Sequence, residues 1–286
     1  MGSMHEPRFL ITGAHGYLGR ALASVAAQRG SVTSCVHSSS LDDSDAVVMD
    51  IGDADAVSEV VASVEPTVII HTAAVNPGQG DDAEMFRINT SGSHNVAQAA
   101  VAVDARLVAV STDIVHDGTA GPYGDEAPAT PINGYGRSKA EGEEAILGSD
   151  PTAVVVRTSL MYGLGEMDRG TRGFAERVIA GETVSLFSDV MRNPVRVGDL
   201  AEALVRLADS EYSGFLNVAG AQALSREEFG RRMLRYWGVA SDGMIEAVRA
   251  QDISDSIPVD VRLDSSRAEE LLGMRFPGVD EVLRAG

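Results

Sequence analysis

Three glycines spaced three residues apart follow the first apolar segment of the chain, and they constrain its fold more than any other feature. The glycines are Gly13, Gly16 and Gly19. Residues 8–12 before them are typical of a β-strand, and apolar residues recur at helical spacing after them, up to Val25. Such glycines let backbone N–H groups approach a pyrophosphate at the positive end of the helix. Although the spacing departs from the Gly-x-Gly-x-x-Gly of many dehydrogenases, the sequence predicts a dinucleotide-binding site here.

Short apolar segments alternate with helical patterns after this turn. Further strands are expected at residues 31–36, 46–49, 67–71, 107–110 and 153–157, and helices at residues 56–64 and 81–102, the latter as one long helix. Alternation of this kind predicts a parallel sheet with helices on both faces. We therefore expect a Rossmann-like, doubly wound α/β domain over residues 1–162.

Beyond residue 162 the alternation becomes irregular, which predicts a smaller mixed substrate-binding subdomain over residues 163–286. The expected elements are a helix at residues 197–208, a strand at residues 215–218, a helix after the capping-box sequence Ser225–Glu228 and a last helical turn or two at residues 263–272. Some of these elements are expected to return to the sheet of the first domain.

The composition of the 286-residue chain excludes several classes of protein. Its net charge of -19 would repel nucleic acids and anionic membranes, so neither is an expected partner. The single cysteine, Cys35, excludes an internal disulfide and a cysteine-rich metal site, and we expect no metal. No apolar run approaches the ~18 residues that cross a bilayer, and no signal-like start is present, so we expect a cytoplasmic protein.

The residues after the second expected strand bear on which dinucleotide binds. An acid at this position would hold the ribose 2′-hydroxyl of NAD, but the chain continues as His37, Ser38 and Ser39. These side chains could accept the 2′-phosphate of NADP, which favours NADP as the cofactor. The alternative stays open that these residues form a polar loop without a role in binding and that the cofactor is NAD. Asp50 and Ile51 follow the third expected strand, where they are placed to contact adenine.

Tyr135 and Lys139 lie four residues apart in an expected helix, and Lys139 is the only lysine among 23 basic residues. Arginine stands everywhere else, so position 139 calls for a compact ammonium rather than a planar guanidinium. At helical spacing the phenol and the ammonium share one face, and a nearby positive charge favours the phenolate. Tyr135 is therefore a candidate proton donor and acceptor, although an ordinary helix with a surface lysine has the same spacing.

The fourth expected strand is followed by small residues and leads to a helix with a candidate ligand. Ala73 and Ala74 come shortly after the strand ends at His71, and their size would let a cofactor pass closely. His71 itself is interpreted as a satisfied core histidine. Asn89 in the following helix could bind a ligand or satisfy backbone groups.

The fifth expected strand ends in Ser111, Thr112 and Asp113. In doubly wound sheets ligands bind at the carboxyl ends of the strands. A loop rich in turn-forming residues follows at 117–126 and leads to the helix with Tyr135. These three polar residues are therefore candidates for contact with a ligand.

Together these motifs resemble the extended short-chain dehydrogenases/reductases of the NAD-dependent epimerase/dehydratase family. The resemblance rests on the glycine turn, Asp50-Ile51, Ala73-Ala74, Asn89, Ser111-Thr112 and Tyr135-x-x-x-Lys139, which occur in this order over nearly the whole chain. Residues 111–118 and 135–143, with Pro122-Tyr123, Glu126, Pro131, Arg157-Thr158-Ser159 and Tyr162-Gly163, are most similar to the dTDP-4-dehydrorhamnose reductase group.

The resemblance implies an NAD(P)H-dependent reductase of a nucleotide-linked 4-ketosugar. Tyr135 would give its proton to the developing alkoxide, Lys139 would hold the nicotinamide ribose and keep the tyrosine acidic, and Thr112 would orient the carbonyl. The expected cofactor-binding residues are Gly13, His15, Gly16, Tyr17, Leu18, Gly19, His37, Ser38, Ser39, Asp50, Ile51, Ala73, Ala74, Asn89, Ser111, Tyr135, Lys139 and Thr158. The expected substrate-binding residues are Val75, Thr112, Asp113, Tyr135, Ser159 and Arg192. Arg192 is expected to bind the substrate diphosphate. The alternative is that Arg192 is a solvated surface arginine.

Two departures from the group bear on the substrate. Residues 75–84 are typical of the wider epimerase and dehydratase family, and Ile257-Pro258 stands where many members place an arginine before a proline. A nucleotide-sugar epimerase stays open, as does a non-catalytic NADP-binding regulatory subunit such as the β subunit of methionine adenosyltransferase. The pair Asp113-Ile114 argues against a sugar 4,6-dehydratase, in which an Asp-Glu pair performs the elimination. The sequence does not specify the sugar, its nucleotide or the oligomeric state, for which a homodimer is one option.

Overall fold

The computed structural model describes residues 6–37 and 46–285, and it divides into two compact units. Unit 1 comprises residues 1–112, 134–157 and 201–216, and unit 2 comprises residues 113–133, 158–200 and 217–286. Each unit thus combines three segments of the chain, whereas a single domain boundary near residue 162 remains a prediction. No helix in the described ranges is both long and apolar enough to span a membrane.

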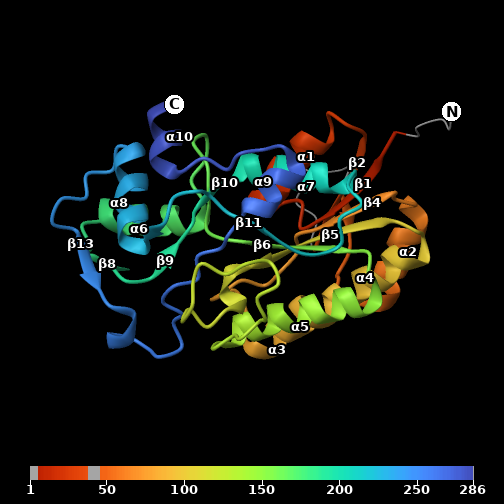
Figure 1. The fold of residues 1–286 in the computed structure, drawn as a ribbon, viewed down its shortest axis with the longest axis horizontal. Coiled ribbons are helices and arrows are strands. Elements are labelled where there is room, and N and C mark those ends of the chain that lie inside the picture. The colour runs from red at the N-terminus through yellow and green to blue at the C-terminus, as the bar shows by residue number, and fades with distance from the viewer. Residues whose placement is uncertain (1–5, 38–45, 286) are drawn as a thin grey trace. The chain divides into compact units, whose positions relative to one another are not determined.

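Unit 1 is built on a 7-stranded sheet with the strand order β11-β6-β5-β4-β1-β2-β3 (Figure 1). The strands are β1 (Arg8–Thr12), β2 (Ser31–Val36), β3 (Val47–Val48), β4 (Val68–His71), β5 (Arg106–Thr112), β6 (Val154–Thr158) and β11 (Gly214–Val218). β1 pairs in parallel with both β2 and β4, and β4 pairs in parallel with β5. The strand order therefore reverses between β1 and β4, which is the switch point at which doubly wound sheets bind ligands.

Helices cover both faces of this sheet (Figure 1). They are α1 (Tyr17–Ala26), α2 (Ala54–Val64), α3 (Asp82–Met85), α4 (Ser93–Ala102), α5 (Gly134–Ser149) and α7 (Val197–Ala208), of which α7 begins in unit 2. A continuous apolar core joins Val57, Val96 and Ile146 of α2, α4 and α5 to Ile69 and Leu107 of the strands. The predicted Rossmann-like fold with a parallel sheet is confirmed.

The segment expected as one helix over residues 81–102 is interrupted. Between α3 and α4, residues Phe86–Gly92 form a π-helix, so the expectation of a regular helix is wrong there. The carbonyl of Asn89 in this turn accepts a hydrogen bond from Ser93 Oγ at 2.7 Å. It also lies so close to α5 that a Cβ on Gly142 would stand 2.3 Å from it. π-helical turns are frequent at functional sites, and Asn89 is one of the expected site residues.

Unit 2 contains three 2-stranded sheets. In these sheets β7 (Met161–Tyr162) pairs with β10 (Val195–Arg196), β9 (Met191–Arg192) with β12 (Leu224–Ser225), and β8 (Val184–Phe187) with β13 (Ile245–Val248). The helices are α6 (Arg169–Ile179), α8 (Arg226–Tyr236), α9 (Ser266–Leu272) and α10 (Val279–Ala285), with 3₁₀ turns at Asp113–Val115 and Ala250–Asp252. Helix α10 was not predicted, and it packs in one apolar cluster with α8 and Tyr162.

The predicted capping box at the start of α8 is confirmed. Ser225 Oγ accepts a hydrogen bond from the Glu228 N–H at 3.0 Å, and the Glu228 carboxylate accepts one from the Ser225 N–H at 2.9 Å. These two bonds satisfy donors that the first helical turn would otherwise leave unpaired. The boundary between β12 and α8 is therefore set by local sequence.

Candidate functional site

The glycine turn after β1 is too tightly packed for side chains at two of its three glycines. Gly13 has a φ of 70°, a backbone conformation that favours glycine. A Cβ on Gly13 would lie 2.8 Å from the Ala73 backbone, and a Cβ on Gly19 would lie 2.3 Å from the Gly13 carbonyl oxygen. The loops after β1 and β4 therefore meet at the switch point of the sheet.

The remaining glycine, Gly16, is the N-cap of α1 and supplies no side-chain hydrogen bond to the first helical turn. Gly16 and His15 are exposed and Tyr17 is half-buried, whereas the Leu18 side chain is buried. An exposed helix start without a side-chain cap suits an anion such as a pyrophosphate. The turn thus fits a dinucleotide through its backbone N–H groups, and the Leu18 side chain belongs to the core.

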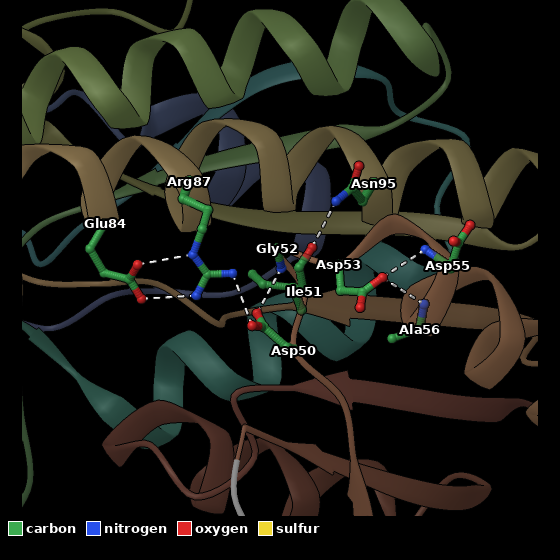
Figure 2. Close-up of polar contacts among 9 residues, drawn as sticks. All are labelled: Asp50, Ile51, Gly52, Asp53, Asp55, Ala56, Glu84, Arg87 and Asn95. Carbon is green, nitrogen blue, oxygen red and sulfur yellow. Dashed lines mark hydrogen bonds and ion pairs between the residues drawn. The ribbon is translucent and has the colours of Figure 1, made fainter.

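Asp50 and Ile51 lie between β3 and α2, in a loop that the protein itself holds in place (Figure 2). The Asp50 carboxylate accepts hydrogen bonds from Arg87 Nη1 and from the Gly52 N–H, each at 2.9 Å. Burial raises the pKa of the Asp50 carboxyl, but these hydrogen bonds outweigh burial, so the pKa lies below its usual value. The Ile51 side chain is buried in the core, and its carbonyl accepts from Asn95 at 2.9 Å. A contact from Ile51 to adenine would therefore involve its backbone.

The residues expected to distinguish NADP from NAD follow β2. His37 is exposed directly after this strand, and its charge contributes to the lowered pKa of Asp50. His37 therefore lies in the neighbourhood of the Asp50 loop. Ser38 and Ser39 lie outside the described residues.

Tyr135 and Lys139 both belong to α5, as their spacing predicted. The Lys139 side chain is buried, and its Nζ donates to the Val110 carbonyl of β5 at 2.9 Å, so it is not a surface lysine on an ordinary helix. Burial lowers the pKa of Lys139 to about 8, while the Glu143 charge opposes this change. Tyr135 is half-buried, and its hydroxyl lies 3.5 Å from Asn76 Oδ1. A fixed ammonium and a more accessible phenol at helical spacing can support proton transfer by Tyr135.

Glu143, one turn after Lys139, forms a buried ion pair that sequence reasoning missed. Its carboxylate accepts from Arg157 Nη2 at 2.7 Å and from Arg157 Nε at 3.0 Å, and the two side chains are 2% and 1% exposed. The Arg157 guanidinium also lies over the Phe215 ring, 4.1 Å from its centre. The pair ties α5 to β6 and so fixes the helix face that carries Lys139. The only signal in the sequence was the spacing of four residues between Lys139 and Glu143.

Asn89 in the π-helical turn is fully buried and binds protein groups. Its Oδ1 accepts from the Val75 N–H at 2.8 Å, and its Nδ2 donates to the Val75 carbonyl and to Ser138 Oγ, each at 3.0 Å. Ala73 and Ala74, just before this clamp, are half-buried. Of the two interpretations of Asn89, these bonds favour the partner of backbone groups. Asn89 thus positions the segment after β4 against α5.

His71 at the end of β4 is a satisfied core histidine, as expected. Its Nδ1 lies 2.7 Å from Thr12 Oγ1, and its Nε2 lies 3.2 Å from Ser93 Oγ. Burial lowers the pKa of His71 to about 3, and the Lys139 charge lowers it as well. The ring is therefore neutral at ordinary pH and joins β4 to β1 and α4.

Ser111 and Thr112 end β5, and Ser111 has an unused polar atom. Its Oγ is buried and has no hydrogen-bond partner within the part of the chain that the structure describes. Such an atom is commonly satisfied by a ligand or by water. Thr112 is half-buried. The Ser111 hydroxyl is thus a second feature of unit 1, after the uncapped start of α1, that fits a bound cofactor.

Arg192 in β9 is buried and is not the solvated surface arginine that the sequence left open. It is 8% exposed, and its Nη1 donates to Asp113 Oδ1 at 2.6 Å. The structure thus brings together two of the expected substrate-binding residues inside unit 2. The Ser159 Oγ is also buried and lacks a partner among residues 6–37 and 46–285. The Thr158 hydroxyl, by contrast, donates to the Val218 carbonyl at 2.7 Å and is used within the protein.

A further arginine, Arg226, lies next to β9 and was missed by sequence reasoning. It is the first residue of α8, a position where acidic residues are favoured by the helix dipole. That mismatch was the signal available in the sequence. On the other side of β9, Met191 bonds with residues 259 and 261. Ile257 shortly before them supplies no charge, in keeping with the departure from the reductase group.

Known proteins resemble this chain over most of its length. A family model described as RmlD substrate binding domain matches residues 7–284. The dTDP-4-dehydrorhamnose reductase of Mycolicibacterium smegmatis is 35% identical over 233 residues, which are 78% of this chain and 67% of the relative. Methionine adenosyltransferase 2 subunit beta of Bos taurus is 29% identical over 96% of this chain and 87% of the relative. The structure of dTDP-4-dehydrorhamnose reductase from Bacillus anthracis in complex with NADP has a TM-score of 0.84 and 26% identity, covering 98% of both chains.

Proposed function

Since this chain belongs to the RmlD substrate binding domain family, whose model matches residues 7–284, we propose that it is an NADPH-dependent reductase of a nucleotide-linked 4-ketosugar similar to dTDP-4-dehydrorhamnose. The observation that carries the proposal is the buried Lys139 ammonium on the same helix as Tyr135. The likeness to two dTDP-4-dehydrorhamnose reductases, one of them bound to NADP, supports the substrate class and the cofactor.

The cofactor would be held mainly by unit 1. The N–H groups of the glycine turn would bind its pyrophosphate, the Asp50 loop its adenine, and His37 with the two serines after it the 2′-phosphate. The unpaired Ser111 hydroxyl is available to a polar group of the cofactor. When bound, NADPH supplies the hydride that reduces the ketone carbon.

Tyr135 donates its proton to the carbonyl oxygen as that oxygen gains negative charge. The positive charge of Lys139 stabilises the phenolate that remains, and the hydrogen bond to the Val110 carbonyl keeps this charge in place. With a pKa of about 8, Lys139 is mostly protonated at pH 7. Thr112 orients the substrate carbonyl through its hydroxyl.

The residues after Thr112 argue against elimination of water. Asp113 is buried and bonded to Arg192 at 2.6 Å, and the next residue, Ile114, cannot carry a proton. A sugar dehydratase needs a base for the C5 proton and an acid for the C6 hydroxyl. The chain therefore lacks the second group, and net reduction is the reaction that we propose.

The test is the mass of the product measured together with absorbance at the nicotinamide band. We expect one NADPH to be consumed per product, and a product that is heavier than the ketosugar by two hydrogen atoms. A product lighter by one water without net cofactor change would instead show a dehydratase. An isomer of unchanged mass with cofactor still bound would show an epimerase.

Tyr135→Phe is expected to lower kcat by about 10²–10⁴-fold while the Kd of NADPH is unchanged, because only the transferable proton is lost. Tyr236→Phe removes an exposed phenol from α8 and serves as the matched control. Near-normal turnover of Tyr135→Phe would refute its assignment as proton donor.

A second candidate is a regulatory subunit, because the bovine methionine adenosyltransferase subunit is similar over 96% of this chain. Cofactor binding without turnover of any ketosugar would favour it, whereas the presence of Thr112, Tyr135 and Lys139 favours the reductase. A homodimer and a cytoplasmic location stay predictions.

A further inference from the structure

Arg226 is held beside Arg192 by backbone pairing within unit 2. Strand β12 runs antiparallel to β9, with Leu224 opposite Arg192. Arg226 follows β12 directly, and its N–H donates to the Val190 carbonyl at 3.0 Å. The backbone of Arg226 is therefore fixed against the strand that carries Arg192.

The Arg226 side chain is a partly buried cation without a counterion. Its guanidinium forms no hydrogen bond and no ion pair with any residue in the described ranges. Burial, together with the neighbouring Arg192 charge, lowers the pKa of Arg226 to about 10, and the charges of Asp168 and Asp113 oppose this only in part. Keeping a cation away from water without a partner destabilises the folded protein. The local contacts of Arg226 do not offset this cost.

Neither of the two carboxylates near Arg226 accepts a hydrogen bond from it: Asp113 is bonded to Arg192, and Asp168 to α6. Asp113 accepts from Arg192 Nη1 at 2.6 Å, yet the Nε of Arg192 is buried and has no acceptor among the residues that the structure describes. Asp168 caps α6 by accepting from the Thr171 N–H at 3.0 Å. The two neighbouring guanidinium groups therefore keep hydrogen-bond donors that these carboxylates do not satisfy.

The start of α8 adds positive potential at the same place. The helix has 11 residues, and its N-terminal end carries a partial positive charge. Of the acids in its first turn, Glu228 accepts from the Ser225 N–H and Glu227 pairs with Arg231 at 2.7 Å. A cation at the first position opposes the helix dipole, whereas a bound anion would be stabilised by the helix and by both arginines. Arginine binds phosphate oxygens with two parallel hydrogen bonds, so a diphosphate matches this pair.

We infer that Arg226 is a substrate-binding residue that, together with Arg192, binds the diphosphate of the nucleotide-linked sugar. The inference rests on the proposed function and adds a residue that the resemblance did not indicate. Because the contact is made to phosphate oxygens, it applies to nucleoside diphosphates with or without the sugar. Free dTDP and UDP are therefore sufficient probes.

The test is isothermal titration of dTDP and UDP into the wild-type protein and into Arg226→Met and Arg192→Met. Methionine keeps the apolar stem of the side chain and removes the guanidinium. We expect Arg226→Met to raise the Kd of both nucleotides by about 10–100-fold, because charge-assisted hydrogen bonds to the phosphates are lost. The Kd of NADPH should stay within about twofold of wild type. Arg235→Met, which removes an exposed charge from the same helix, is the matched control and should change neither Kd.

Thermal unfolding without nucleotide separates binding from a structural role. Removal of an unpaired, partly buried cation should leave the Tm unchanged or raise it, whereas loss of a structural arginine would lower it. A lowered Tm with unchanged dTDP and UDP affinity would overturn the inference, and so would a weakened affinity for NADPH alone.

The same titrations separate this inference from the proposed function. If wild-type protein reduces a nucleotide ketosugar but Arg226→Met binds dTDP and UDP normally, only the inference fails. If the wild-type protein binds neither nucleotide, the inference fails together with the proposed substrate class.

Discussion

Replacing Lys139 by methionine tests how much the buried ammonium costs the folded protein. Methionine has a similar length and carries no charge. Burial lowers the pKa of Lys139 from 10.5 to about 8, which corresponds to about 3 kcal/mol in the free energy of unfolding at neutral pH. The substitution also removes the donor to the Val110 carbonyl, at a cost of about 1–2 kcal/mol. We therefore expect Lys139→Met to be more stable than wild type at pH 7 by about 1–2 kcal/mol and to lose turnover.

The two pKa values also determine how this difference depends on pH. Below pH 8 the lysine is protonated in the folded and in the unfolded protein, so the full cost of the buried charge is present. Between pH 8 and pH 10.5 the folded protein releases this proton first, and the wild type gains stability relative to the variant as the pH rises. Above pH 10.5 only the lost hydrogen bond to Val110 remains, so the variant becomes the less stable protein.

The assay is urea unfolding of nucleotide-free protein at pH 7 and at pH 10, followed by circular dichroism. Arg137→Met, at an exposed position of the same helix, is the control and should show little difference between the two pH values. A Lys139→Met variant that is less stable than wild type at pH 7 would contradict the reasoning. A stability difference that does not change with pH would contradict it as well.

Two further predictions concern the cofactor and the core of unit 1. The protein is expected to bind NADPH at least as tightly as NADH in a fluorescence titration. His37→Asp should shift the preference toward NADH, because a carboxylate repels the 2′-phosphate. A strong NADH preference of the wild type would show that His37 and the two serines after it do not contact the ribose. Glu143→Gln is expected to lower the free energy of unfolding by about 3–5 kcal/mol, since it leaves the Arg157 charge buried without its partner. Urea unfolding measures this loss, the exposed neighbour Glu144→Gln is the control, and a loss below about 1 kcal/mol would show that the pair contributes little.

Much of the fold was predictable because its signals are local. The glycine turn, the alternation of strands and helices and the capping box at Ser225 each depend on residues close together in the chain. The π-helical turn at Phe86–Gly92 was not predictable in this way. Its contacts to Val75, Ser138 and Gly142 come from other segments, and helical periodicity does not record them.

The sequence by itself determined the fold class, the candidate catalytic pair and the position of most strands. Only the tertiary structure decided the state of each polar side chain. It buried Lys139 and lowered its pKa, joined Arg192 to Asp113 across 79 residues of chain, and left Arg226 without a counterion. The physical reason is that a side chain's charge and availability depend on desolvation and on its partners, and both come from segments far apart in the sequence.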